Sequence, residues 1–193
     1  MDTRRRRLFV ATPLLMLAAR PALAQNADAG DPAALLRAGG SVALLRHALA
    51  PGTFDPPQFR LGDCSTQRNL NDEGRAQARR IGAWFAGRQL QPAAVRSSPW
   101  CRCVDTAQLA FGRADVLPAL GSPHGRDDAA RAAQRGELLA ALRAVPRGQF
   151  EVWVTHDFVL SLLLGDRSAS GGGLVATAEP GGEARVLARL APA

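Results

Sequence analysis

The sequence predicts an α/β domain in which helices cover both faces of a mostly parallel central sheet, a three-layer α/β/α sandwich. Three observations predict this fold class. Two short apolar runs, residues 41–46 and 150–155, have the character of buried parallel strands. Longer segments with helical spacing of small and apolar residues, such as 71–87 and 127–145, alternate with them. A chain of 193 residues can bury one sizeable core but not comfortably two.

The first elements follow from local signals. Residues 31–38 predict a short helix, because Asp31 can cap it, a proline follows in the first turn, and a glycine pair ends it. The strand 41–46 comes next. Residues 48–70 show no periodicity and contain three prolines. Because loops of this length in compact domains are usually functional or disordered, and this one carries aromatic and charged residues, we expect an ordered lid beside the strand end.

The middle of the chain continues the alternation. Asn71 can cap a helix that ends near Gly87. Residues 93–97 predict a short strand, and the helix 98–111 is expected to open at a Ser-Pro pair. Residues 115–120 could form one more small strand.

The C-terminal part predicts a helix over 127–145, a strand over 150–155, a short helix over 158–164, and an edge hairpin of strands 174–178 and 185–190. A Pro-Gly-Gly turn separates the two hairpin strands.

Residues 1–24 have the three parts of an export signal. Arg4–Arg7 are positive, Leu8–Ala19 are apolar, and Ala22–Ala24 form a small-residue cleavage site. The apolar part is too short to span a bilayer stably. The arginine pair also resembles a twin-arginine signal, and the choice between the two export routes stays open. We expect cleavage after Ala24 and a single mature domain, residues 25–193, in a periplasm-like space.

The basic composition is concentrated in this signal. Five of the 24 arginines and one of the 17 acidic residues precede residue 25, which leaves the rest of the chain at a formal net charge of only +3. The chain contains no lysine and no basic run after the signal. This composition argues against a nucleic-acid partner, and no other apolar run has transmembrane length.

The three cysteines allow at most one internal disulfide. An oxidising destination favours a bridge. Cys101 and Cys103 are two residues apart on an expected helix, so they point apart and should not pair. The expected bridge joins Cys64 to one of them, and the partner stays open.

Charged and titratable residues gather where strands end. Arg46-His47 closes the strand 41–46, His156-Asp157 follows the strand 150–155, and Arg102 lies in the first turn of a helix. Because the carboxyl ends of parallel strands share one sheet edge, these residues can meet in one crevice. Two arginines and two histidines around one anion predict a phosphoryl-transfer site that needs no metal. Rings of the two histidines on opposite sides of the sheet, or Arg102 buried against an unrelated carboxylate, would overturn the enzymatic interpretation.

Four segments together resemble the histidine phosphatase superfamily, which has the phosphoglycerate-mutase-like fold. They are the signature Arg46-His47-Ala48, the helix start from Leu70 to Ala78, the Ser-Ser-Pro-x-x-Arg-x-x-x-Thr-Ala segment from Ser97 to Ala107, and the apolar strand from Val152 to Thr155-His156. They stand in family order over roughly residues 40–165. The exported form is most similar to small bacterial periplasmic members, and loosely to those related to lipopolysaccharide-core heptose phosphatases.

The resemblance implies roles for these residues. His47 would accept the phosphoryl group, Arg46 and Arg102 would bind its oxygens, and His156 would complete the pocket. The family's common glycine is replaced by Ala48. No cofactor is implied.

The proton donor is the open position. The glutamate of the mutase-type branch is missing after the helix that carries Arg102. Asp157 resembles the His-Asp pair of the acid-phosphatase branch and is the first candidate. Asp63, Asp127 and Asp128 are the alternatives, since the leaving alkoxide needs a proton from a group within hydrogen-bond reach.

No metal site is expected, because the three histidines and three cysteines lack metal-ligand spacing. His124 is expected at the surface. The sequence therefore predicts a periplasmic, metal-independent phosphomonoesterase that forms a phosphohistidine and acts on a phosphorylated small molecule or glycan. The alternatives are a non-catalytic binder of a phosphorylated glycan or lipid head group, and a phosphomutase. Substrate identity and oligomeric state are not encoded in any readable pattern.

Overall fold

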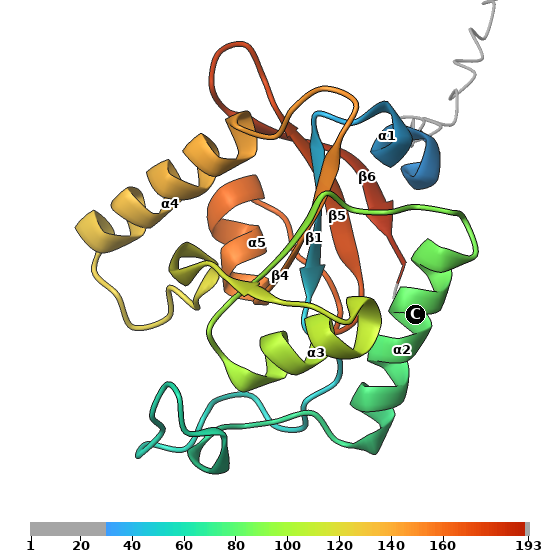
Figure 1. Ribbon diagram of the computed structural model, residues 1–193. Helices are drawn as coiled ribbons and strands as arrows, with labels where there is room; N and C mark the ends of the chain where they lie inside the picture. Colours follow the sequence, from blue (N-terminus) through green and yellow to red (C-terminus); the bar gives the residue numbers. More distant parts are fainter. Residues whose placement is uncertain (1–29, 192–193) are drawn as a thin grey trace, which may run out of the picture.

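The computed structural model describes residues 30–191 (Figure 1), and the export signal predicted for residues 1–24 lies outside them. Within the described residues, six strands form one sheet in the order β3-β2-β4-β1-β5-β6. Along that order the strands are β3 (Asp115–Val116), β2 (Ala94–Ser97), β4 (Phe150–Thr155), β1 (Ser41–Arg46), β5 (Gly173–Ala178) and β6 (Ala184–Leu190). No described helix is long and apolar enough to cross a membrane.

The sheet is mostly parallel, as predicted. Strands β3, β2, β4 and β1 run in one direction, while β5 pairs with β1 and β6 in antiparallel fashion. The predicted C-terminal hairpin is therefore present at one edge. A parallel arrangement places the carboxyl ends of β2, β4 and β1 side by side.

Helices cover both faces of the sheet (Figure 1). The helices are α1 (Pro32–Ala38), α2 (Asp72–Ala86), α3 (Cys101–Phe111), α4 (Asp128–Arg143) and α5 (Asp157–Leu164). Alternation along β1 connects the layers: Ala43 and Leu45 join the core formed with α1, α2 and α3, whereas Val42 and Leu44 join the core formed with α4 and α5. The predicted three-layer α/β/α sandwich is confirmed.

Two element boundaries differ from the sequence prediction by three residues or more. Helix α3 begins at Cys101, three residues after Ser98, because the N–H of Ser98 still donates to the carbonyl of Val154 and keeps this backbone extended. The strand expected over residues 115–120 ends at Val116. A 3-10 helix, Pro118–Leu120, follows it; Pro118 has no N–H to donate to a neighbouring strand.

The long loop, residues 48–70, lies at the end of the sheet where β1 finishes (Figure 1, cyan to teal). It contains one 3-10 helix, Cys64–Thr66. A disulfide joins Cys64 to Cys101, at the start of α3, so the partner left open by the sequence is Cys101. Cys103 is free and buried. The loop is thus fixed covalently beside the ends of the parallel strands.

Candidate active site

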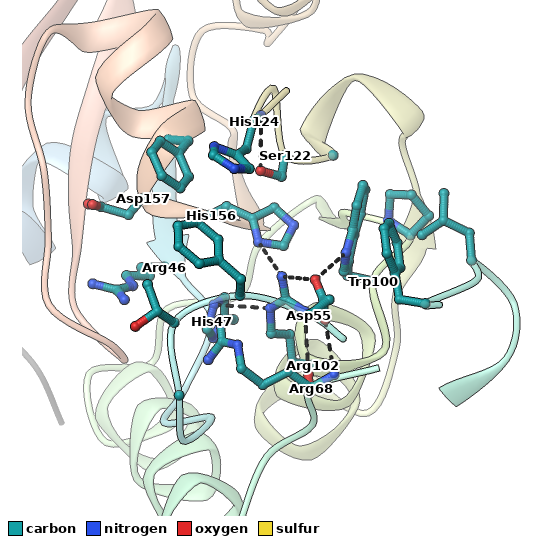
Figure 2. Close-up of a pocket in the computed structure, with 18 of the residues that line it drawn as sticks. Arg46, His47, Asp55, Arg68, Trp100, Arg102, Ser122, His124, His156 and Asp157 are labelled. Atoms are coloured by element: carbon teal, nitrogen blue, oxygen red, sulfur yellow. Dashed lines mark hydrogen bonds and ion pairs between the residues drawn. The ribbon is translucent and has the colours of Figure 1, made fainter. Parts of the chain in front are cut away.

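The two histidines predicted for the site follow neighbouring parallel strands. Arg46, the last residue of β1, is in register with Thr155, the last residue of β4. His47 and His156 come next at the same sheet edge, and their ring centroids lie 5.6 Å apart in an edge-to-face arrangement. Both side chains are almost fully buried. The structure therefore brings the two rings together on one side of the sheet (Figure 2).

His47 presents an unprotonated ring nitrogen. Its Nδ1 lies 2.8 Å from the carbonyl oxygen of Ala48 and must carry the proton there, which leaves the lone pair on Nε2. Arg102 Nε donates to that Nε2 at 3.3 Å. Burial lowers the pKa of His47 to about 3, with a further lowering by the Arg102 guanidinium and an opposing effect of the Ala48 hydrogen bond. At neutral pH the imidazole is uncharged, as a nucleophile requires.

His156 is held in a similar way. Its Nδ1 faces Arg102 Nη2 at 3.5 Å, and its Nε2 lies 2.8 Å from Ser98 Oγ. Nε2–H therefore donates to Ser98, and the edge of the ring meets Trp100 with centroids 5.1 Å apart. Burial, followed by the charge of Arg102, lowers the pKa of His156 well below its ordinary value. His156 is thus a second neutral imidazole of fixed orientation.

The backbone after His47 is fixed by α2 and α3. The N–H of Ala48 donates to Thr106 Oγ1 at 3.0 Å, and this hydroxyl donates to the carbonyl of Arg102 at 2.7 Å. A Cβ on Gly74 would lie 1.9 Å from the carbonyl oxygen of Leu49, so only glycine lets α2 approach so closely. Ala48 is fully buried and is not among the described residues with positive φ, so alanine fits at the position of the family's common glycine.

Arg102 connects both imidazoles to a carboxylate that the sequence analysis did not single out. Besides its contacts with the two rings, it donates Nη1 and Nη2 to the two oxygens of Asp55, at 2.8 and 3.2 Å. Asp55 belongs to the long loop and also accepts from the N–H of Arg68 and from Trp100 Nε1. Burial acts to raise the pKa of Asp55, but hydrogen bonds from Arg68 and Arg102 outweigh it and hold that pKa below its usual range.

Burial of Arg102 against a carboxylate outside the site would have contradicted a phosphoryl-transfer site. Asp55, however, belongs to the same cavity as the other predicted site residues. Asp55 and Arg102 both line a cavity of about 780 Å³, together with both histidines. A bidentate carboxylate occupies the guanidinium donors that two phosphoryl oxygens would use. Asp55 therefore marks an anion position within the cavity.

Two more guanidinium groups face this cavity. Arg46 donates Nη1 to the carbonyl of Ser168 at 3.0 Å, and Arg68 donates to the carbonyl of Ala50. Within the described chain, the buried Nε atoms of Arg46 and Arg68 have no hydrogen-bond partner. Arg68 was missed as a site residue because no motif marks it. Together Arg46, His47, Arg68, Arg102 and His156 form what we call the anion pocket.

The four proton donors predicted from the sequence differ in whether they line the cavity. Asp157 lines the cavity, but its carboxylate pairs with Arg167 Nε at 2.9 Å and accepts from the N–H of Ser168. The other three candidates do not line the cavity: Asp63 caps the 3-10 helix and pairs with Arg60, Asp127 caps α4, and Asp128 pairs with Arg131.

Two further sequence expectations concern metal ligands and His124. Within residues 30–191, no group of three or more His, Cys, Asp or Glu side chains is placed to hold a metal ion. His124 is exposed, as expected, but it also lines the cavity. The buried thiol of Cys103 lies 3.6 Å from His156 Nε2, and burial raises its pKa to about 12.

Comparisons with known proteins show what this fold and site resemble. The family model of the histidine phosphatase superfamily (branch 1) matches residues 42–120. The match includes the segments around His47 and Arg102, and over these residues the chain is similar to the superfamily. Comparison with curated protein sequences finds no significant match.

Several solved structures share the fold. The SixA protein from Agrobacterium tumefaciens is 26% identical, with a TM-score of 0.51, and the match covers 79% of this chain and 99% of that one. The protein histidine phosphatase SixA complexed with tungstate is 18% identical, with a TM-score of 0.56, over 79% and 97% of the two chains. A mutant phosphoserine phosphatase from Entamoeba histolytica, in complex with phosphoserine, is 13% identical, with a TM-score of 0.55, over 78% and 96%.

Proposed function

We propose that the protein is a metal-independent phosphomonoesterase that acts through a phosphohistidine formed on His47. The observation that carries the proposal is the unprotonated Nε2 of a buried imidazole in the same pocket as the guanidinium groups of Arg46, Arg68 and Arg102. These cations supply the charge stabilisation that a transferring phosphoryl group needs. His156 adds a neutral imidazole beside the same anion position.

The reaction has two displacements. In the first, the lone pair of His47 Nε2 forms a bond to phosphorus while the bond to the leaving oxygen breaks, and that oxygen takes a proton. In the second, a water oxygen forms a bond to phosphorus, the N–P bond breaks, and orthophosphate leaves. His47 is regenerated with its proton still on Nδ1, where the carbonyl of Ala48 holds it.

Substrate entry requires an exchange at Arg102. The phosphoryl oxygens take the Nη donors that Asp55 holds in the free enzyme. Asp55 then loses a cation and gains an anionic neighbour, and both changes raise its pKa. A carboxyl group that becomes protonated beside the phosphoryl group is suited to donate a proton to the leaving oxygen.

Asp55 and Asp157 are therefore the two candidates for the proton donor. Asp157 has the support of the His-Asp pair seen in the sequence. Asp55 has the support of position, because it shares Arg102 with the proposed phosphoryl site, whereas Asp157 is paired with Arg167 at the side of the cavity. We favour Asp55 on this ground.

The decisive experiment measures hydrolysis of p-nitrophenyl phosphate with excess chelator, for the wild type and for His47→Ala. We expect activity in the wild type and almost none in the variant. With ³²P-labelled substrate, rapid quenching of the wild type should trap a labelled enzyme, and this label should be stable to base and labile to acid. A wild-type rate equal to that of the variant would leave a non-catalytic phospho-ligand binding protein. Transfer of the label to an added phosphorylated acceptor, instead of to water, would identify a phosphomutase.

The proposed setting is a periplasm-like compartment, with a phosphorylated small molecule or glycan as substrate. The Cys64–Cys101 disulfide supports an oxidising destination, and the signal features of residues 1–24 support export. Cell fractionation of the full-length protein tests this location. A variant with Arg4–Arg7 replaced is the control that should not be exported. Retention of the wild type in the cytoplasm would contradict the proposed location.

A further inference from the structure

Apolar side chains gather at the mouth of the cavity. Six large hydrophobic residues of the described chain are exposed, and four of them line this cavity: Phe54, Phe59, Leu61 and Phe158. Exposed apolar residues scattered singly are ordinary, but a cluster around one opening marks a recognition surface.

Aromatic rings are stacked on two sides of this opening. On one side the His124 ring is stacked between two phenylalanine rings. Its centroid lies 4.9 Å from that of Phe54 and 5.2 Å from that of Phe158. On the other side Phe59 stacks on Trp100 at 5.9 Å. We call these five residues the aromatic rim.

The rim is continuous with the anion pocket. Phe54 directly precedes Asp55, and Trp100 donates its Nε1–H to the Asp55 carboxylate at 3.1 Å. Figure 2 shows Trp100 beside Asp55 and Arg102, whereas His124 lies beyond His156, next to Ser122. An ester whose phosphoryl group binds at Arg102 therefore places its organic part among these rings.

The rim is also held in place before a ligand binds. The disulfide joins the loop that carries Phe54 and Phe59 to Cys101, the residue between Trp100 and Arg102. Prolines 56, 57 and 99 line the same opening. A site whose side chains and backbone are already ordered loses little entropy on binding.

We propose that the aromatic rim binds the organic part of the substrate, so that the enzyme prefers phosphomonoesters of alcohols that carry an aromatic ring over those of polyols. This inference rests on the proposed function and names the substrate class for the same site. A polyol would lose hydrogen bonds to water against stacked rings, whereas an aryl group gains buried area and stacking.

The test compares 3-phenylpropyl phosphate with glycerol 1-phosphate. Both release a primary alcohol, so their intrinsic reactivity is similar and kcat/KM reports recognition. We expect the wild type to favour the phenyl ester by about tenfold or more, as burial of one ring provides. Phe158→Ala and Phe59→Ala should each reduce this ratio severalfold. Both residues are exposed, so their truncation leaves no buried void.

Val116→Ala is the matched control, because Val116 is also an exposed apolar residue but does not line the cavity. An unchanged ratio in this control, with reduced ratios in the rim variants, supports the proposal. Equal kcat/KM values for the two esters, with activity that still depends on His47, would overturn it and leave the proposed function intact.

A binding measurement tests the role of the aromatic rim independently of catalytic activity. If neither ester is hydrolysed in a His47-dependent manner, calorimetric titration with benzylphosphonate and with methylphosphonate still decides the question. Tighter binding of benzylphosphonate, lost in Phe158→Ala, supports the rim as a binding site. Equal binding of the two phosphonates contradicts it.

Discussion

Asp55 and Arg102 form a bidentate ion pair, with oxygen–nitrogen distances of 2.8 and 3.2 Å, inside the cavity that also contains both imidazoles. The pair is nearly excluded from solvent, since the side chains are 13% and 5% exposed. A carboxylate here satisfies a buried guanidinium, and under the proposed function a phosphoryl group would replace it. The proposal therefore makes the pair both a structural contact and a competitor of the substrate.

Replacement of Asp55 should separate substrates by their leaving groups. In Asp55→Asn we expect kcat for glycerol 1-phosphate to fall about 100-fold, because its alkoxide cannot leave without a proton. The rate for p-nitrophenyl phosphate should change far less, since nitrophenolate is stable as an anion. Steady-state assays of Asp55→Asn and Asp157→Asn with both substrates show which variant loses activity mainly toward glycerol 1-phosphate. If only Asp157→Asn shows the split, Asp157 is the proton donor.

Stability should decrease as the pH falls below the ordinary histidine pKa of about 6.5. Both buried histidines have lowered pKa values, about 3 for His47, so in this range only the unfolded chain binds the protons. The free energy of unfolding is therefore highest above pH 6.5 and declines toward pH 3. Urea unfolding at pH 7 and pH 5 measures this, and His47→Gln should show a smaller decline. An equal decline in both proteins would show that His47 is accessible to protons when folded.

Reduction of the disulfide should destabilise the protein and slow catalysis. The bridge spans 37 residues, and the loss of a constraint of this length costs about 4 kcal/mol in the chain-entropy model. Dithiothreitol should lower Tm in the wild type and have no effect on the doubly substituted Cys64→Ala, Cys101→Ala protein. Activity should fall with it, because the loop carries Asp55 and Arg68. Full activity of the reduced enzyme would show that the loop keeps its position without the bridge.

Two helical glycines should respond to alanine in opposite directions. In α4, a Cβ on Gly136 meets no atom within 4 Å, so Gly136→Ala should stabilise by about 0.5–1 kcal/mol through helix propensity. In α2, Gly74→Ala should destabilise by about 1–3 kcal/mol and reduce kcat, because the new methyl collides with the Leu49 carbonyl two residues after His47. Thermal unfolding and steady-state assays of both variants check this. Stabilisation by Gly74→Ala would mean that the backbone after His47 adjusts freely.

The sequence predicted the fold and the convergence of His47, Arg102 and His156 because both follow from periodic or motif-bearing segments. Strands β1 and β4 are short apolar runs, and parallel topology alone places His47 beside His156. Arg102 could be assigned because it lies in the helix start that carries the family's motif.

The remaining parts depend on the path of a loop that has no periodicity. Nothing in the sequence near Asp55 indicates that it meets Arg102, 47 residues later, since that contact is set by tertiary packing. The disulfide partner was open for the same reason. The start of α3 was predicted too early because a hydrogen bond from Ser98 to Val154 extends the backbone, which no local propensity encodes.

The long loop is anchored at two points, Asp55 through its ion pair and Cys64 through its disulfide. Between them, residues 57–62 are all exposed. Insertions, deletions or randomised side chains in this short span can reshape the entrance while the reacting groups stay where they are. It is the natural place to build a combinatorial library for new selectivity, and the same tolerance would let related enzymes diverge in what they accept without altering how they work.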